Sequence, residues 1–266
     1  MKFFLLQIVL FLILSSTIKS QPDSLNNFVP DRPGMATPPN VLTSRNLQIE
    51  EGSQFEKYKQ GLLNNDNFLF SSPLLRYGIV NILEVRIQTD YVYDKEKDRT
   101  KTSTSTIQGL NPLTIGSKIK LVEQRKTLPD ISVLFNLTLP YFGNKEFRPA
   151  NFAPSFYLLM SKSISEKLNV CFNYGLSWDG SSAVPTHFYA LCLGVNLDER
   201  WSTFIENFGY FSKMTNPVYY IDTGFAYLIN DRLQIDFSAT GYLNSFFSYY
   251  SMNMGIAWKI LQPKQR

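Results

Sequence analysis

The feature that most constrains this chain is an alternation of apolar and polar side chains that recurs over most of its length. It is clearest in the segment that begins at Leu83, where Leu83 and Val85 alternate with the charged side chains of Glu84 and Arg86. Successive side chains of a β-strand point to opposite faces of the sheet. Each such segment therefore has one face suited to lipid and one suited to water or ion pairs. A repeated period of two predicts an antiparallel sheet.

The alternation and the turn residues between segments divide the chain into about twelve strands. Short turns alternate with longer connections near 94–109, 141–153, 179–186 and 212–217, which is typical of outer-membrane barrels. An even number of strands places both ends of the sheet on the periplasmic side. The first two segments and 201–211 alternate poorly, so ten or fourteen strands remain alternatives. The predicted strands are 45–58, 67–79, 82–93, 113–122, 131–139, 155–164, 168–178, 187–197, 201–211, 218–228, 233–243 and 247–260.

Composition favours a membrane barrel over its alternatives. Aromatic residues make up 15% of the chain and charged residues only 18%, whereas about a quarter is charged in soluble proteins. The mean hydropathy of −0.13 is too polar for a bundle of membrane helices. A soluble β-sandwich or a lipocalin-like barrel would bury its apolar face, yet here the apolar face is rich in aromatic residues. We therefore expect an all-β, transmembrane antiparallel β-barrel over residues 45–260, in a bacterial outer membrane.

The segments outside this barrel have a different character. Residues 1–20 combine a positive start, an apolar run and the small Ser20, which is typical of a secretory signal peptide. Residues 21–44 contain five prolines, and proline at this density disfavours both helix and central strand. We expect this segment to be an extended periplasmic lead-in, tethered to the barrel or its mouth. Residues 261–266 form a short C-terminal tail.

The polar faces of the predicted strands carry charges that would point into the barrel. With about twelve strands, the lumen is intermediate between a filled barrel of about eight strands and an open porin. The charges could form a constriction that selects solutes, or an ion-pair network that fills the barrel, and one network could do both. The lumen-lining and selectivity candidates are Glu50, Arg76, Glu84, Arg86, Lys118, Lys120, Glu206, Asp222 and Asp236.

Several short motifs occur along the chain in a fixed order. They are Asp31-Arg32-Pro33-Gly34, Thr37-Pro38-Pro39, Leu47-Gln48-Ile49-Glu50-Glu51-Gly52, Leu74-Leu75-Arg76-Tyr77-Gly78-Ile79, Leu83-Glu84-Val85-Arg86, Ile115-Gly116-Ser117-Lys118, Glu206 with Gly209, Asp222-Thr223-Gly224 and Gln234-Ile235-Asp236. Together they resemble a family of outer-membrane proteins regarded as transporters, which is named after a proposed role in the meta-pathway of phenol degradation. The resemblance spans about residues 31–260. It implies a barrel and a transport role, and it assigns no catalytic or ligand-binding residues.

The sequence gives little support for catalysis. His187 is the single histidine, its same-face neighbour Tyr189 is no serine, and no Gly-x-Ser-x-Gly motif occurs, so a hydrolase is the less favoured alternative. Cys171 and Cys192 are too few for a usual zinc site, and nucleotide-binding glycine motifs are missing. We therefore expect no metal and no cofactor. The two cysteines fall on the lumen phase of neighbouring strands, where a disulfide and two free thiols both remain open.

These inferences predict a non-enzymatic, porin-like transporter. We expect passive movement of small solutes through a charged lumen, with hydrophobic or aromatic compounds among the candidates. The alternative is a plugged structural or partner-binding barrel without an open pore. The expected partners are outer-membrane lipid, a small-molecule solute and the outer-membrane insertion machinery. A net charge of +4 without a basic cluster gives no indication of nucleic-acid binding.

Overall fold

The computed structural model describes residues 28–60, 63–98, 104–243 and 247–261, so the predicted signal peptide and all but the first residue of the predicted tail lie outside the described residues. The described strands are β1 (Asn46–Gln60), β2 (Leu63–Ser71), β3 (Leu74–Val80), β4 (Leu83–Gln88), β5 (Tyr91–Asp98), β6 (Thr104–Leu110), β7 (Thr114–Val122), β8 (Asp130–Thr138), β9 (Ala153–Ser163), β10 (Leu168–Ser177), β11 (Thr186–Asn196), β12 (Trp201–Phe211), β13 (Val218–Asn230), β14 (Leu233–Leu243) and β15 (Phe247–Leu261). One turn of 3-10 helix, η2 (Lys145–Phe147), lies in the connection between β8 and β9. Within these described ranges, no helix is long and apolar enough to cross a membrane.

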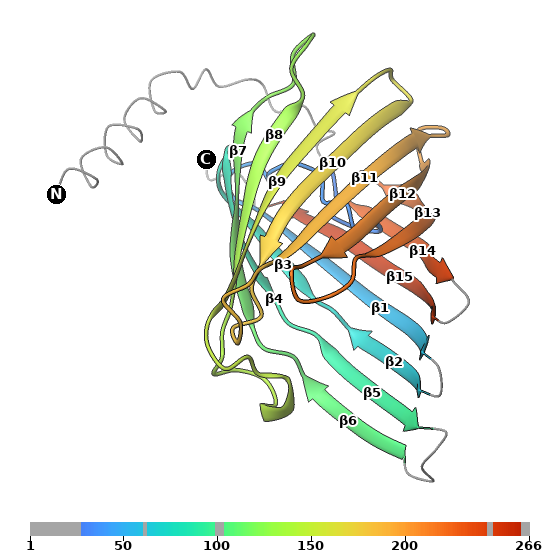
Figure 1. The fold of residues 1–266 in the computed structure, drawn as a ribbon. Coiled ribbons are helices and arrows are strands. Elements are labelled where there is room, and N and C mark those ends of the chain that lie inside the picture. The colour runs from blue at the N-terminus through green and yellow to red at the C-terminus, as the bar shows by residue number, and fades with distance from the viewer. Residues whose placement is uncertain (1–27, 61–62, 99–103, 244–246, 262–266) are drawn as a thin grey trace, which may run out of the picture.

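The strands form one antiparallel sheet that closes on itself (Figure 1). β1 pairs with β15 along its whole length, from Asn46 opposite Leu261 to Gln60 opposite Phe247. Closure satisfies the backbone donors and acceptors at this seam within the sheet, which is the condition for strands to cross lipid. The predicted all-β antiparallel barrel is therefore confirmed.

The fifteen strand segments make up a barrel of twelve strands, because three of the twelve barrel strands are each interrupted once. β2 continues into β3, β4 into β5, and β6 into β7. The three breaks are joined through Asp90, whose carboxylate accepts hydrogen bonds from Ser72 Oγ at 2.6 Å and Asn111 Nδ2 at 3.3 Å. At the first break Pro73 removes a backbone donor, which favours the interruption. The predicted count of twelve is confirmed, although the interruptions were not foreseen.

One predicted loop, at 94–109, is instead mostly a hairpin. β5 runs on to Asp98, and β6 begins at Thr104. The sequence pattern did not reveal this hairpin, because charged residues occupy both faces at the end of β5 and the alternation of apolar and polar side chains is lost there. β6 pairs with β5 on one side, and no described strand pairs with its other edge. Asn144, in the connection after β8, bonds both the N–H and the C=O of Leu110 at the base of that edge.

The two faces of the barrel wall differ in the way that the alternation predicts. In β4, Glu84 and Arg86 are 0% and 8% exposed, whereas Val85 and Ile87 are 39% and 47% exposed. The charged side chains therefore lie inside the barrel and the aliphatic ones on its outer surface. An apolar outer surface on a closed sheet is stable in the hydrocarbon layer of a membrane.

Candidate functional site

The described part of the proline-rich segment, residues 28–44, lies inside the barrel, and together with Arg45, which precedes β1, we call it the plug. It meets the wall at the turn between β3 and β4, where Arg45 N donates to Gly78 O at 2.8 Å and Ser44 N donates to Asn81 Oδ1 at 2.9 Å. Short turns mark the periplasmic side of such barrels, so the plug fills lumen near the periplasmic side. The expectation was a periplasmic lead-in at the barrel or its mouth. The described residues instead lie within the lumen.

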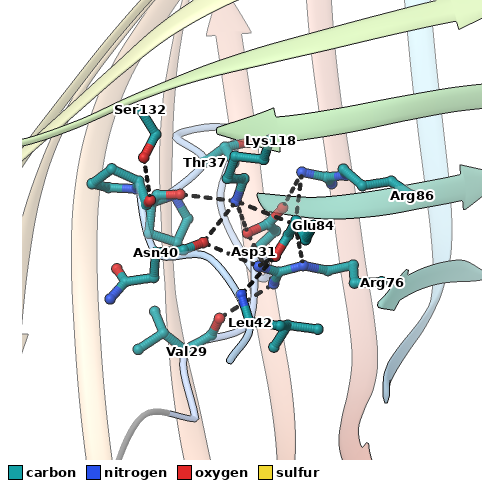
Figure 2. Close-up of polar contacts among 12 residues, drawn as sticks. Val29, Asp31, Thr37, Asn40, Leu42, Arg76, Glu84, Arg86, Lys118 and Ser132 are labelled. Carbon is teal, nitrogen blue, oxygen red and sulfur yellow. Dashed lines mark hydrogen bonds and ion pairs between the residues drawn. The ribbon is translucent and has the colours of Figure 1, made fainter. Parts of the chain in front are cut away.

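Asp31 of the plug is surrounded by three cations from the wall (Figure 2). Its Oδ1 lies 2.8 Å from Lys118 Nζ and 3.1 Å from Arg76 Nη1, and its Oδ2 lies 2.7 Å from Arg86 Nη1. Burial by itself would raise the pKa of Asp31, but the charges of Arg76, Lys118 and Arg86 outweigh it and hold this pKa well below its ordinary value. Asp31 is therefore an anion that forms ion pairs with three adjacent strands of the barrel wall, β3, β4 and β7.

Arg76 is the most completely bonded side chain of the lumen. Its Nε and Nη2 donate to the two carboxylate oxygens of Glu84, both at 2.9 Å, and its Nη1 donates to Glu50 at 2.9 Å. Besides its ion pair with Asp31, it donates to two plug carbonyls, Val29 O at 3.3 Å and Asn40 O at 3.2 Å. A bidentate arginine–carboxylate pair has a fixed geometry, so Arg76 holds the wall and the plug in register.

The two carboxylates that bind Arg76 also accept hydrogen bonds from the plug backbone. Glu50 accepts the N–H of Asp31 at 3.1 and 3.0 Å, and Glu84 accepts the N–H of Leu42 at 2.9 Å. Since an extended segment cannot satisfy its own N–H groups, these contacts supply the partners that burial requires.

Plug carbonyls are satisfied in the same way by donors of the wall. Lys118 Nζ donates to Pro38 O at 3.0 Å and to Asn40 O at 3.3 Å, and Ser132 Oγ donates to Pro39 O at 2.5 Å. Prolines retain an acceptor although they lack a donor. A wall of lysine, serine and arginine therefore suits a proline-rich plug.

The opposite side of the plug contacts the strands of the second half of the chain. Glu206 accepts the backbone N–H of Ala36 at 2.9 Å, and Asn173 Nδ2 donates to Thr37 O at 2.9 Å. Glu206 also accepts the N–H of Met35. The plug thus spans the lumen and is bonded to strands on both sides.

The central ion network has equal numbers of acids and bases. Burying an ion costs several kcal/mol unless its partners and hydrogen bonds are in place. The network is therefore stable only as a complete set, and the plug supplies one of its anions. The members of the ion network, all between 0% and 9% exposed, are Asp31, Glu50, Glu84, Arg76, Arg86 and Lys118.

The nine predicted lumen residues fall into four groups. Five of them belong to the network just described. Two others contact the plug from other strands of the wall. Glu206 accepts hydrogen bonds from the plug backbone, and Asp236 pairs with the plug residue Arg32, whose Nη2 lies 3.1 Å from Asp236 Oδ1. Asp222 is the register partner of Glu206 and is 1% exposed. Lys120 lies apart, half-buried, 3.6 Å from Glu123 and 3.9 Å from Asp130.

The pattern argument missed the plug residues that pair with these wall charges. Asp31 and Arg32 fall in a segment without periodicity, so alternation could not place them. The signal that could have found them is the Asp31-Arg32-Pro33-Gly34 motif, whose charges are unexpected in a simple linker. It also missed a second layer of the lumen, which is aromatic.

This aromatic layer consists of inward-facing rings on β9, β11, β12, β13 and β15. The rings of Phe208 and Tyr220 stack with centroids 5.0 Å apart, and those of Phe188 and Tyr210 are 5.3 Å apart. Tyr249 contacts Tyr220 at 5.0 Å. The expectation of charged inward residues therefore holds for only part of the lumen.

A cavity of about 410 Å³ lies where the plug, the ion network and the aromatic layer meet. Gly34, Met35 and Thr37 of the plug line one side of it, and Arg86 and Asn136 are among its polar wall residues. It is within the range of roughly 300–1,000 Å³ that is usual for small-molecule sites.

The two cysteines and the histidine lie on neighbouring strands and make contacts within the barrel wall. Cys171 and Cys192 are direct register partners on β10 and β11, and both are free thiols. His187 stacks on Phe211 with ring centroids 4.8 Å apart, and its Nδ1 lies 2.7 Å from Tyr174 Oη. In the described part of the chain, no group of His, Cys, Asp or Glu is arranged to hold a metal ion.

A closed barrel with an apolar outer surface and a polar, plugged lumen defines an outer-membrane β-barrel protein, and the predicted localisation is confirmed. The chain belongs to the family described as "Putative MetA-pathway of phenol degradation", whose model matches residues 30–260. This confirms the resemblance seen in the sequence motifs. No curated protein matches the chain.

Solved structures support the same fold. An outer membrane channel from Pseudomonas putida F1 is similar at a TM-score of 0.64 and 11% identity, over 91% of this chain and 100% of that one. The translocator domain of the autotransporter NalP from Neisseria meningitidis is similar at 0.51 and 9% identity, over 81% and 89%. The KdgM porin in complex with oligogalacturonate is similar at 0.51 and 8% identity, over 79% and 98%. At these identities the likeness shows the barrel architecture.

Proposed function

We propose that this protein is a passive channel for small solutes and that the plug controls passage through its lumen. The observation that carries the proposal is the position of Asp31, because this one plug carboxylate forms ion pairs with three wall cations at 2.7 to 3.1 Å. The plug is held by ion pairs and hydrogen bonds, which can exchange for water when the segment moves. Displacement of the plug would leave a lumen lined by the wall charges of the network, with one cation more than the anions.

The solute class follows from the two layers of the lumen. Charged residues near the periplasmic side favour a hydrated path, and the aromatic layer offers apolar contact to hydrophobic or aromatic compounds. The similar barrel from Pseudomonas putida F1 is an outer membrane channel, which is consistent with a transport role for a barrel of the same architecture. We propose that the nine lumen residues act on selectivity according to their distance from the plug, with Arg86 and Glu84 foremost.

Single-channel recording in a planar bilayer tests this function. The mature chain should give discrete conductance steps, and Arg86→Ala and Glu84→Ala should change both the ion selectivity and the time spent open. Lys126→Ala, on an exposed periplasmic turn, is the matched control and should behave as the unmodified protein. A silent bilayer, with heat-modifiable mobility on a gel showing that folded barrel is present, would reject the channel.

The second candidate is a barrel that stays plugged and serves as a scaffold. The observation in its favour is the balance of the buried network, since a fully paired set of charges also stabilises a closed lumen. The same recordings separate the two, because a scaffold remains silent when Arg86 or Glu84 is replaced. In either case the apolar outer surface contacts outer-membrane lipid, and we propose that the general insertion machinery of that membrane assembles the barrel.

A further inference from the structure

The cavity beside the plug has a feature that the rest of the ion network lacks, namely a cation with unused donors. The Nη1 atom of Arg86 pairs with Asp31 Oδ2 at 2.7 Å and lies 3.9 Å from Glu84, whereas in the described part of the chain its Nε and Nη2 have no hydrogen-bond partner. A guanidinium carries five N–H donors. Arg76 on the next strand, by contrast, donates to both Glu84 oxygens, to Glu50 and to two carbonyls.

Arg86 is 92% buried, being 8% exposed, and it lines the cavity. Leaving buried donors unpaired is costly, so this position is suited to a hydrogen-bond acceptor that enters the cavity. No other residue that lines the cavity is charged at neutral pH. The cavity therefore offers its one cationic side chain and the unused Nε and Nη2 donors of that side chain at one place, and both favour an anionic oxygen group.

The aromatic side of the same cavity is formed by Tyr157, Phe188 and Tyr210. Tyr157 and Phe188 lie edge to face with centroids 5.9 Å apart, and Phe188 and Tyr210 are 5.3 Å apart. Rings arranged in this way accept a further planar ring by offset stacking or edge contact. Asn136 lines the cavity with Arg86, and its amide adds both a donor and an acceptor.

We propose that this cavity is a binding site for small aromatic carboxylates, with the carboxylate at Arg86 and the ring against Phe188, Tyr157 and Tyr210. Arg86 recognises the anion because a guanidinium matches a carboxylate with two parallel hydrogen bonds. The inference deepens the proposed function. The role of the bound carboxylate in transport rests on that function, whereas binding itself does not require conduction.

Calorimetric titration of the full mature chain in detergent tests the site, with benzoate as the probe. Benzamide has the same ring and nearly the same shape without the charge, and acetate has the charge without the ring. We expect saturable binding of benzoate at one site, with benzamide and acetate each at least about tenfold weaker, as loss of one charged or aromatic contact implies. Equal binding of benzoate and benzamide would overturn the anionic part of the inference.

Two variants locate the site. Arg86→Gln and Phe188→Leu should each weaken benzoate binding by roughly tenfold or more. Lys126→Gln, an exposed cation, and Phe225→Leu, a ring on the outer surface, are the matched controls and should leave it unchanged. Since Arg86→Gln also removes a partner of Asp31, Phe188→Leu provides an independent test that leaves the ion network intact, and heat-modifiable gel mobility verifies folding of each variant.

The outcomes separate the site from the channel. Benzoate binding in a protein that never conducts would keep the site and reject the proposed channel. Conductance without benzoate binding, or binding that Phe188→Leu and Arg86→Gln do not affect, would overturn the site and leave the channel standing.

Discussion

Gly52 and Gly255 are register partners across the seam between β1 and β15, and the guanidinium of Arg32 lies directly against both. A Cβ at Gly255 would collide with Arg32 Nε, and one at Gly52 would collide with Arg32 Nη1. The seam that closes the barrel is therefore also the place where the plug fits against the wall. From here Arg32 reaches Asp236 at 3.1 Å.

Gly255→Val should loosen the plug. The added side chain occupies the space of the Arg32 guanidinium and breaks its ion pair with Asp236, so we expect a severalfold longer open time in planar bilayers. Gly241→Val is the control, because a Cβ at Gly241 meets nothing within 4 Å. Unchanged gating in Gly255→Val would show that this contact does not hold the plug.

Arg76→Met should strongly destabilise the folded barrel. The substitution leaves Glu84 and Glu50 buried without their main cation, and removing one partner of a buried pair costs about 3–5 kcal/mol. Denaturant unfolding in lipid vesicles measures this loss. Lys57→Met, which breaks the partly exposed pair with Asp66, should cost less than about 1 kcal/mol. Equal losses in the two variants would contradict the central role of the network.

The attachment of the plug should depend on pH through Asp31. Its pKa in the folded protein is held below the ordinary value, which is near 3.9. The stabilisation is therefore fully present above about pH 4 to 5 and is lost as the pH falls through the lower folded pKa. We expect unchanged conductance between neutral pH and about pH 5, and more frequent opening at strongly acidic pH.

Asp31→Asn is the companion of that experiment. The amide carries no charge to pair with Arg76, Arg86 and Lys118, so the plug should be weakly held at every pH, and the acid-induced opening should disappear. Conductance recorded between pH 3 and pH 8, for the unmodified protein and for Asp31→Asn, checks both expectations. An acid response that persists in Asp31→Asn would assign it to another group.

The cysteines should react as two thiols. Cys171 and Cys192 are opposite each other and free, and nothing in the ion network depends on a bond between them. Alkylation after denaturation, followed by mass spectrometry, should add two equivalents of reagent without prior reduction. Labelling that appears only after reduction would show that the native protein carries a cross-strand disulfide.

The alternation of side chains determined most of the wall. A one-residue shift reverses every side chain of a strand, so once Glu84 and Arg86 are assigned to the lumen, Val85 and Ile87 must face outward. The same rule placed Lys118 and Glu206 inside. It failed where both faces are charged, as at the end of β5, and it gave no warning of inward rings such as Phe188, because an aromatic residue fits either face.

The plug and the cavity were decided by tertiary structure alone. Asp31 lies 45 or more positions in the chain from Arg76, Arg86 and Lys118, and Arg32 meets Asp236 across a separation of 204 positions. An extended, proline-rich segment has no period that reveals its neighbours, and its partners are fixed only when the sheet closes around it. The sequence by itself therefore determined a barrel with a charged interior, and closure of that barrel determined which of those charges hold the plug and which of them, Arg86, also lines the cavity.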